Sequence, residues 1–74
     1  MSTKIQFTNN DKYYEFKNDH EFFRMIYETW DGVRVEFDDD NRIVEFNGMS
    51  EHEVMYGNIC LATCFTPEEI QVVK

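Results

Sequence analysis

Residues 33–47, VRVEFDDDNRIVEFN, alternate apolar and polar side chains on both sides of a polar centre. Alternation with a period of two is typical of a strand that buries one of its faces. A turn at Asp40-Asn41 therefore predicts a hairpin, and a four-residue loop from Asp38 to Asn41 would preserve the same facing. In this hairpin the apolar side chains meet in two cross-strand pairs: Phe37 with Val44, and Val35 with Phe46.

The other face of this predicted hairpin is mostly charged. It places Glu36 directly opposite Glu45, and like charges facing each other across two strands cost up to about 1 kcal/mol. Folding alone gives little reason for such a pair, so the pair favours a role in binding. The residues expected on this face are Arg34, Glu36, Asp38, Ile43 and Glu45.

The stretch before the hairpin has helical spacing. Large apolar residues share one arc, and charged residues occupy the opposite one, which predicts an amphipathic helix over Asp19–Trp30. Asn18 and Glu21 have the spacing of a capping box, and Gly32 follows as a C-terminal glycine. The apolar arc consists of Phe22, Phe23, Ile26, Tyr27 and Trp30.

The first segment, Lys4–Lys17, is interpreted as another hairpin. Its turn is placed at Asn10-Asp11, a residue pair that suits a two-residue turn. The resulting register puts four apolar residues on one face, with Phe7 opposite Tyr14 and Ile5 opposite Phe16.

The last third is less regular. Ser50 and Glu53 predict a capping box for a short helix that Gly57 ends. The apolar stretch 59–65 fits a strand or a buried helix equally well. The segment 66–69, TPEE, predicts the start of a final short helix, because a threonine cap precedes a proline and two acids.

Together these segments predict one α+β domain over residues 1–74, with ββαββ order and a short C-terminal helix. Its two hairpins form an antiparallel sheet packed on the amphipathic helix. The expected core consists of Ile5, Phe7, Tyr14, Phe16, Phe22, Phe23, Ile26, Trp30, Val35, Phe37, Val44 and Phe46.

The net charge limits the possible classes of function more than any sequence motif does. Asp and Glu number 15 against 7 Lys and Arg, a net charge of −8, yet 16% of the residues are aromatic, which indicates a folded domain with an acidic surface. Such a surface repels nucleic acid and anionic membranes and attracts basic proteins. With no apolar run to suggest a leader or a membrane span, we expect a cytoplasmic protein, in the host cytoplasm if a phage encodes it.

Catalytic and cofactor motifs are missing from the sequence. Asp38-Asp39-Asp40 lacks the glycine and the glutamate that an EF-hand loop requires, so no calcium site is expected. Cys60 and Cys64 are spaced poorly for zinc or a disulfide and are interpreted as buried free thiols. His52 lies between two glutamates but has no nucleophile in a motif context. We therefore expect no enzyme activity, no cofactor and no metal.

In composition the chain resembles the small acidic inhibitors that phages use against host nucleases, restriction enzymes or CRISPR effectors. This resemblance rests on size and charge and implies a nucleic-acid mimic that occupies a basic site on a larger enzyme, without binding nucleic acid itself. A homodimerising scaffold domain is the first alternative, and a small-ligand or metal binder is the second, so the protein is expected to be a monomer or a homodimer. The predicted partner-binding residues are Glu28, Asp31, Glu36, Asp38, Asp39, Asp40 and Glu45.

Overall fold

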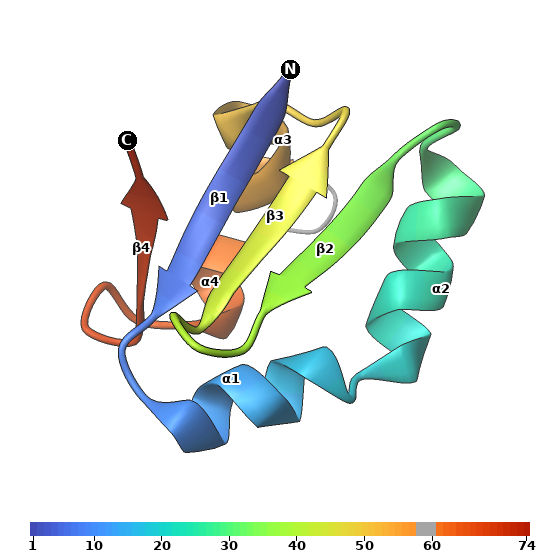
Figure 1. Cartoon of the computed structure of the whole chain (residues 1–74). Coiled ribbons are helices and arrows are strands. Elements are labelled where there is room, and N and C mark those ends of the chain that lie inside the picture. Colours follow the sequence, from blue (N-terminus) through green and yellow to red (C-terminus); the bar gives the residue numbers. More distant parts are fainter. Residues whose placement is uncertain (58–60) are drawn as a thin grey trace.

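The computed structural model describes residues 1–57 and 61–74. Its strands form one antiparallel sheet in the order β2-β3-β1-β4, so the predicted α+β class is confirmed (Figure 1). The strands are β1 (Ser2–Phe7), β2 (Arg34–Asp38), β3 (Ile43–Asn47) and β4 (Ile70–Val73). The helices in the described ranges are α1 (Asn10–Lys17), α2 (His20–Thr29), α3 (Glu51–Tyr56) and α4 (Leu61–Cys64).

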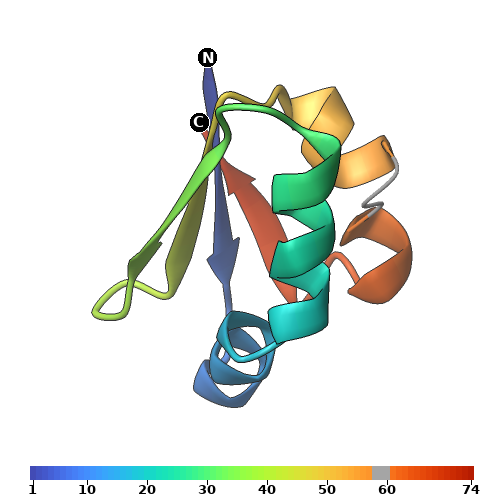
Figure 2. The ribbon, with the colours of Figure 1, turned by 90° about the vertical axis from the view of Figure 1, so that its right-hand side faces the viewer.

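α2, α3 and α4 lie on one side of the sheet, α1 lies across one end of the strands, and the opposite face is uncovered (Figure 2). Alternate residues of the two central strands point toward the helices, so Ile5, Phe7, Val44 and Phe46 are fully buried. The intervening residues of the same strands project from the uncovered face. In the described part of the chain, no helix is long and apolar enough to cross a membrane.

The predicted second hairpin is confirmed together with its register. β2 and β3 pair Val35 with Phe46 and Phe37 with Val44. The loop spans residues 39–42, and Arg42 adopts a positive φ of 58° at its end. Alternating apolar residues fixed the parity of this pairing, because a slip by one residue would expose the whole apolar set.

The predicted first hairpin is wrong in its second half, because Asn10–Lys17 forms α1 instead of a strand. The Asn9 side chain accepts a hydrogen bond from the Lys12 amide at 2.9 Å, which starts a helix where a turn was expected. α1 then buries Tyr13 and Phe16, three residues apart, and leaves Tyr14 43% exposed. Tyr13 therefore replaces Tyr14 in the core.

The predicted amphipathic helix is confirmed as α2, with a different cap. Asp19 is the N-cap, and its carboxylate accepts from the Phe22 amide at 3.1 Å. Asn18 instead ends α1, since its amide side chain donates to the Tyr14 carbonyl at 2.9 Å. Gly32 has a φ of +76°, a left-handed conformation that turns the chain back into β2.

The capping box of Ser50 and Glu53 is confirmed at the start of α3, and Gly57 caps its end. Within the undecided stretch 59–65, Leu61–Cys64 is helical, whereas Ile59 and Cys60 lie outside the described residues. The expected final helix is wrong. Residues 66–69 form a turn in which the Glu69 amide donates to the Thr66 carbonyl at 2.9 Å, and β4 follows.

The fourth strand therefore comes from the far end of the chain. β4 pairs with β1, and it brings Ile70 opposite Phe7 and Val72 opposite Ile5. Several residues expected in the core are half-buried at its margin: Phe22, Phe23, Trp30, Val35 and Phe37. The core also contains buried residues that the sequence did not single out: Val33, Met49, Val54, Leu61 and Ile70.

Candidate functional site

The uncovered face of the β2–β3 hairpin carries the predicted carboxylates. Val35 and Phe37 face the helices, so Glu36 and Asp38 between and after them project from the opposite side of β2. The register places Glu36 directly across from Glu45, as the sequence predicted. A shallow hollow of about 140 Å³ lies among these side chains, lined by Lys4, Glu36, Phe37, Asp38, Ile43 and Glu45.

Lys4 belongs to this face and was not expected there. β1 pairs with β3, so Lys4 lies directly across from Glu45, on the side away from Glu36. The face is therefore mixed: a row runs Glu36, Glu45, Lys4 across three strands. Arg34 adds a second positive charge at the opposite end of β2 from the loop. The negative charge is thus concentrated in the half of the hairpin nearest its loop.

Asp38 holds the loop in shape. Its two carboxylate oxygens accept from the backbone amide of Asn41 at 3.3 Å and from the Asn41 side chain at 2.9 Å. These hydrogen bonds lower the pKa of Asp38, the side chain of Asn41 contributing most. Asp38 is therefore ionised at neutral pH, and its side chain is exposed to solvent.

Asp39 is bound within the protein and is not free to contact a partner with both oxygens. Lys17 donates to its carboxylate at 2.8 and 2.9 Å, and the Tyr13 hydroxyl donates to it at 2.6 Å. The Lys17 hydrogen bond, with that of Tyr13, lowers the pKa of Asp39, while burial and the nearby carboxylate raise the pKa of Tyr13. Asp39 therefore ties the hairpin loop to α1, and its contact with a partner stays a prediction.

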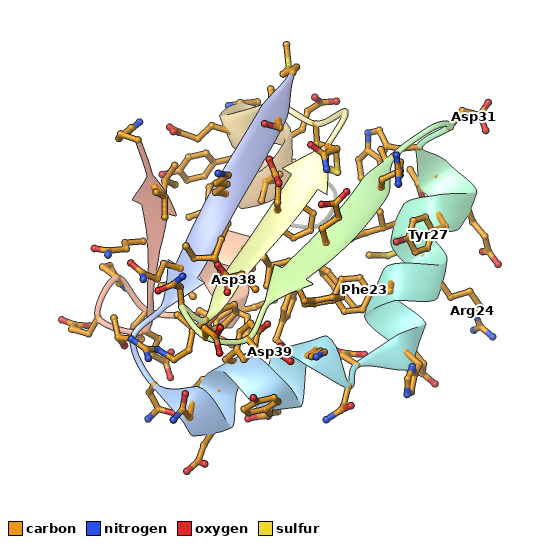
Figure 3. The ribbon with its side chains drawn as sticks, in the orientation of Figure 1. Phe23, Arg24, Tyr27, Asp31, Asp38 and Asp39 are labelled. Carbon is orange, nitrogen blue, oxygen red and sulfur yellow. The ribbon has the colours of Figure 1, made fainter. Side chains whose placement is uncertain are left out.

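The remaining predicted acids lie in two separate places. Asp40 is exposed in the loop between β2 and β3. Asp31 lies beyond the C-terminal end of α2, at the opposite end of β2 from Asp38 and Asp39 (Figure 3). Glu28 is exposed on the last turn of α2, in the helix layer. The structure brings together Glu36, Asp38 and Glu45 around one hollow. With Asp40 from the loop between the same two strands, we term these residues the acidic hairpin face: Glu36, Asp38, Asp40 and Glu45.

Several lysines outside this face are paired with acids. Lys17 binds Asp39, Lys74 binds Glu51 at 2.7 Å, and Lys12 lies 3.5 Å from Glu69. These pairs neutralise acidic groups in the hairpin loop, on α3 and in the turn before β4. They leave the excess negative charge of the molecule on other surfaces, of which the acidic hairpin face is one.

The side chains that commonly bind metals are scattered in the part of the chain that the structure describes. Over residues 1–57 and 61–74, no group of three His, Cys, Asp or Glu side chains could hold a metal ion. Cys64 is a free thiol, but it is exposed, so the expectation that it is buried is wrong. The cause is its place at the end of α4, where only Leu61 faces the core. Cys60 lies outside the described residues.

The chain matches no protein-family model, no curated protein and no solved structure.

Proposed function

We propose that the protein binds the basic, nucleic-acid-binding site of a larger protein and thereby inhibits it. The acidic hairpin face is the contact surface in this proposal. The observation that carries it is the direct pairing of Glu36 with Glu45 on the uncovered face of the sheet. Like charges directly opposite each other lower stability, and Lys4 on the far side of Glu45 offsets part of this effect. A basic partner placed over both carboxylates would relieve the remaining repulsion.

The strand geometry supports mimicry of a phosphate backbone. Side chains on the same face of one strand are about 6.6 Å apart, which gives Glu36 and Asp38 a regular spacing. Glu45 adds a third carboxylate on the neighbouring strand. Carboxylates present negative charge and acceptor oxygens to Arg and Lys, as phosphates do.

The loop is held in place before a partner arrives. Asp39 ties it to Lys17 and Tyr13 on α1, and Asp38 ties it to Asn41. A surface that is already ordered loses less conformational entropy on binding. Asp39 therefore supports the binding surface by positioning the loop.

The net charge of −8 supports the same proposal at long range. Charge of this sign speeds the encounter with a basic partner and slows the encounter with nucleic acid. We propose a nuclease or another nucleic-acid-binding enzyme as the partner. Phage-encoded inhibitors of restriction enzymes and CRISPR effectors are the class that this composition resembles, so such enzymes are the first candidates to test.

Charge reversal on two surfaces tests the proposal. The hairpin variant is Glu36→Lys with Glu45→Lys, and the matched control is Glu28→Lys with Asp31→Lys in the α2 region. Both double variants remove the same amount of negative charge, so a difference between them reports position. We expect the hairpin variant to slow association with the partner by roughly 10-fold or more at low salt, with a smaller effect at high salt.

The control should associate nearly as fast as the wild type. Surface plasmon resonance at several salt concentrations measures both rates, and circular dichroism checks that each variant is folded. Equal slowing by the two variants would assign the effect to net charge and would contradict a specific hairpin surface.

A further inference from the structure

A second hollow is lined by residues of three helices, α1, α2 and α4, and of the segments beside them. Its volume is about 90 Å³. A cavity that holds benzene measures roughly 150 Å³, so this hollow has room for one small chemical group, while the rest of a ligand stays in solvent. Three phenylalanines and two acids are among the lining residues: Phe16, Phe22, Phe65, Glu15 and Asp19.

The phenylalanines of this hollow form an aromatic corner. The ring centroid of Phe16 lies 4.8 Å from that of Phe22 and 5.8 Å from that of Phe65, and the ring planes are inclined by 60° and 79°. Phe16 is 4% exposed, whereas Phe22 and Phe65 are half-buried, so Phe16 lies deepest. Rings at such angles enclose a small group from more than one side, and the face of an aromatic ring attracts a cation.

The two acids give the same hollow a negative charge. The side chain of Glu15 is 72% exposed, and its ion pair with Lys12 spans 3.9 Å, while Lys12 lies closer to Glu69, at 3.5 Å. Asp19 caps α2 through one oxygen, which accepts from the Phe22 amide at 3.1 Å. Over residues 1–57 and 61–74, the other oxygen of Asp19 has no hydrogen-bond partner, and no lining residue is basic. Both acids therefore have an oxygen to offer a cation.

We propose that this hollow binds the trimethylammonium group of a ligand, the group that choline and trimethylated lysine share. Its methyl groups pack against the apolar walls and need no hydrogen bonds. A primary ammonium or a guanidinium group would lose hydration that two carboxylates replace only in part. The positive charge of the ligand interacts with the phenylalanine rings and with Glu15 and Asp19.

The inference does not depend on the proposed function. The acidic hairpin face belongs to β2, β3 and the loop between them, whereas this hollow belongs to α1, α2 and α4. A ligand in the hollow therefore leaves the hairpin free. Titration with a small ligand needs no protein partner, so failure of this inference and failure of the proposed function are separate results.

Ligand titration of the isotope-labelled protein, followed by NMR at constant ionic strength, tests the proposal. Choline and free trimethyl-lysine should each cause saturable shifts centred on the amides of Phe16, Phe22 and Phe65, with a Kd in the millimolar range expected for so small a contact. Binding of both ligands would assign the site to the shared trimethylammonium group, and binding of one alone would identify the source of the ligand.

Two reference compounds separate charge from shape. The neutral analogue of choline, in which a tert-butyl group replaces trimethylammonium, should bind at least about 3-fold more weakly than choline, because it lacks the charge. Ethanolamine has the charge without the methyl groups and should also bind at least about 3-fold more weakly. A neutral analogue or ethanolamine that binds as tightly as choline would overturn the proposal, as would the absence of shifts at the hollow with both trimethylammonium ligands.

Variants test the acids and the rings. Glu15→Gln with Asp19→Asn should weaken choline binding by about 5-fold and leave binding of the neutral analogue unchanged. Asparagine caps a helix as well as aspartate does, so α2 should stay folded. The matched control, Glu28→Gln with Asp31→Asn, removes the same charge at exposed positions and should bind choline nearly as the wild type does.

Phe22→Leu keeps an apolar side chain but removes a ring, so this variant should bind choline and the neutral analogue about equally. Equal weakening of choline binding by the two double variants would overturn the proposal. So would a Phe22→Leu protein that keeps the full preference for choline over the neutral analogue.

Discussion

Asp39 belongs to a run of three acids in the sequence. In the folded protein its hydrogen bonds link the hairpin loop to α1. It lies between the exposed residues Asp38 and Asp40, and nothing in the sequence distinguishes it from them. In the structure it accepts hydrogen bonds from Tyr13 and Lys17. The carboxylate thereby gives the buried Tyr13 hydroxyl an acceptor, without which a buried hydroxyl group would lower stability.

Tyr13→Phe should lower the free energy of unfolding by roughly 1–3 kcal/mol, because the hydrogen bond from the hydroxyl to a charged acceptor is lost. The ring should stay in place, since it packs against Phe7. Urea denaturation measures the change. Tyr14→Phe is the matched control, with an expected change below about 0.5 kcal/mol because Tyr14 is largely exposed. Equal effects of the two substitutions would contradict the role given to the Tyr13 hydroxyl.

The same carboxylate predicts a dependence of stability on pH. The pKa of Asp39 is lowered in the folded protein from its ordinary value of 3.8. A lowered folded-state pKa stabilises the protein fully above the unfolded-state pKa, and this contribution disappears as the pH falls through the folded-state pKa. Stability should therefore decline in acid below about pH 4. Asp39→Asn should be less stable at pH 7 and decline less in acid; an unchanged acid decline would contradict the assignment.

Part of the candidate site could be predicted from the sequence, residue by residue. The Glu36–Glu45 pair follows from strand parity, which local alternation determines. The positions of Asp39 and Lys4 depend on α1 and β1, whose packing around the hairpin is a non-local property. Lys4 in particular was assigned to a different pairing, so its place beside Glu45 could not be anticipated.

Among the elements, α1 shows why local patterns can mislead. The doublet Tyr13-Tyr14 with Phe16 fits a period of two through Tyr14 and a helical spacing through Tyr13. The Asn9 cap and the burial of Tyr13 decide in favour of the helix. The second hairpin has no such ambiguity, because two apolar residues on each strand share one parity. β4 was missed since its partner, β1, lies at the other end of the chain.

The capping box of α3 gives a prediction at the element scale. Ser50→Ala should cost about 1 kcal/mol of stability, because the serine hydroxyl accepts from the Glu53 amide at 3.2 Å. The control is Ser2→Ala at an exposed position of β1, which should change stability by less than about 0.5 kcal/mol. Thermal denaturation compares the two variants, and a Ser50→Ala protein as stable as the Ser2→Ala protein would show that the cap contributes little.

At the scale of the whole molecule, the helices cover one face of the sheet and leave the other face and one edge open. The open face includes Glu36, Asp38 and Glu45, and the open edge is β4, beside a mostly apolar hollow lined by residues of α3, α4 and β4. These two surfaces differ in chemistry, one being charged and the other apolar with unpaired backbone groups.

The central claim, that the acidic hairpin face competes with nucleic acid for a basic site, is tested most directly by capture from host lysate with and without excess DNA. Three immobilised proteins are compared: the wild type, Glu36→Lys with Glu45→Lys, and Glu28→Lys with Asp31→Lys. Mass spectrometry should identify one nucleic-acid-binding protein that the wild type and the α2 variant retain, that the hairpin variant loses, and that DNA displaces. Equal capture by all three proteins, or capture that DNA leaves unchanged, would contradict the claim.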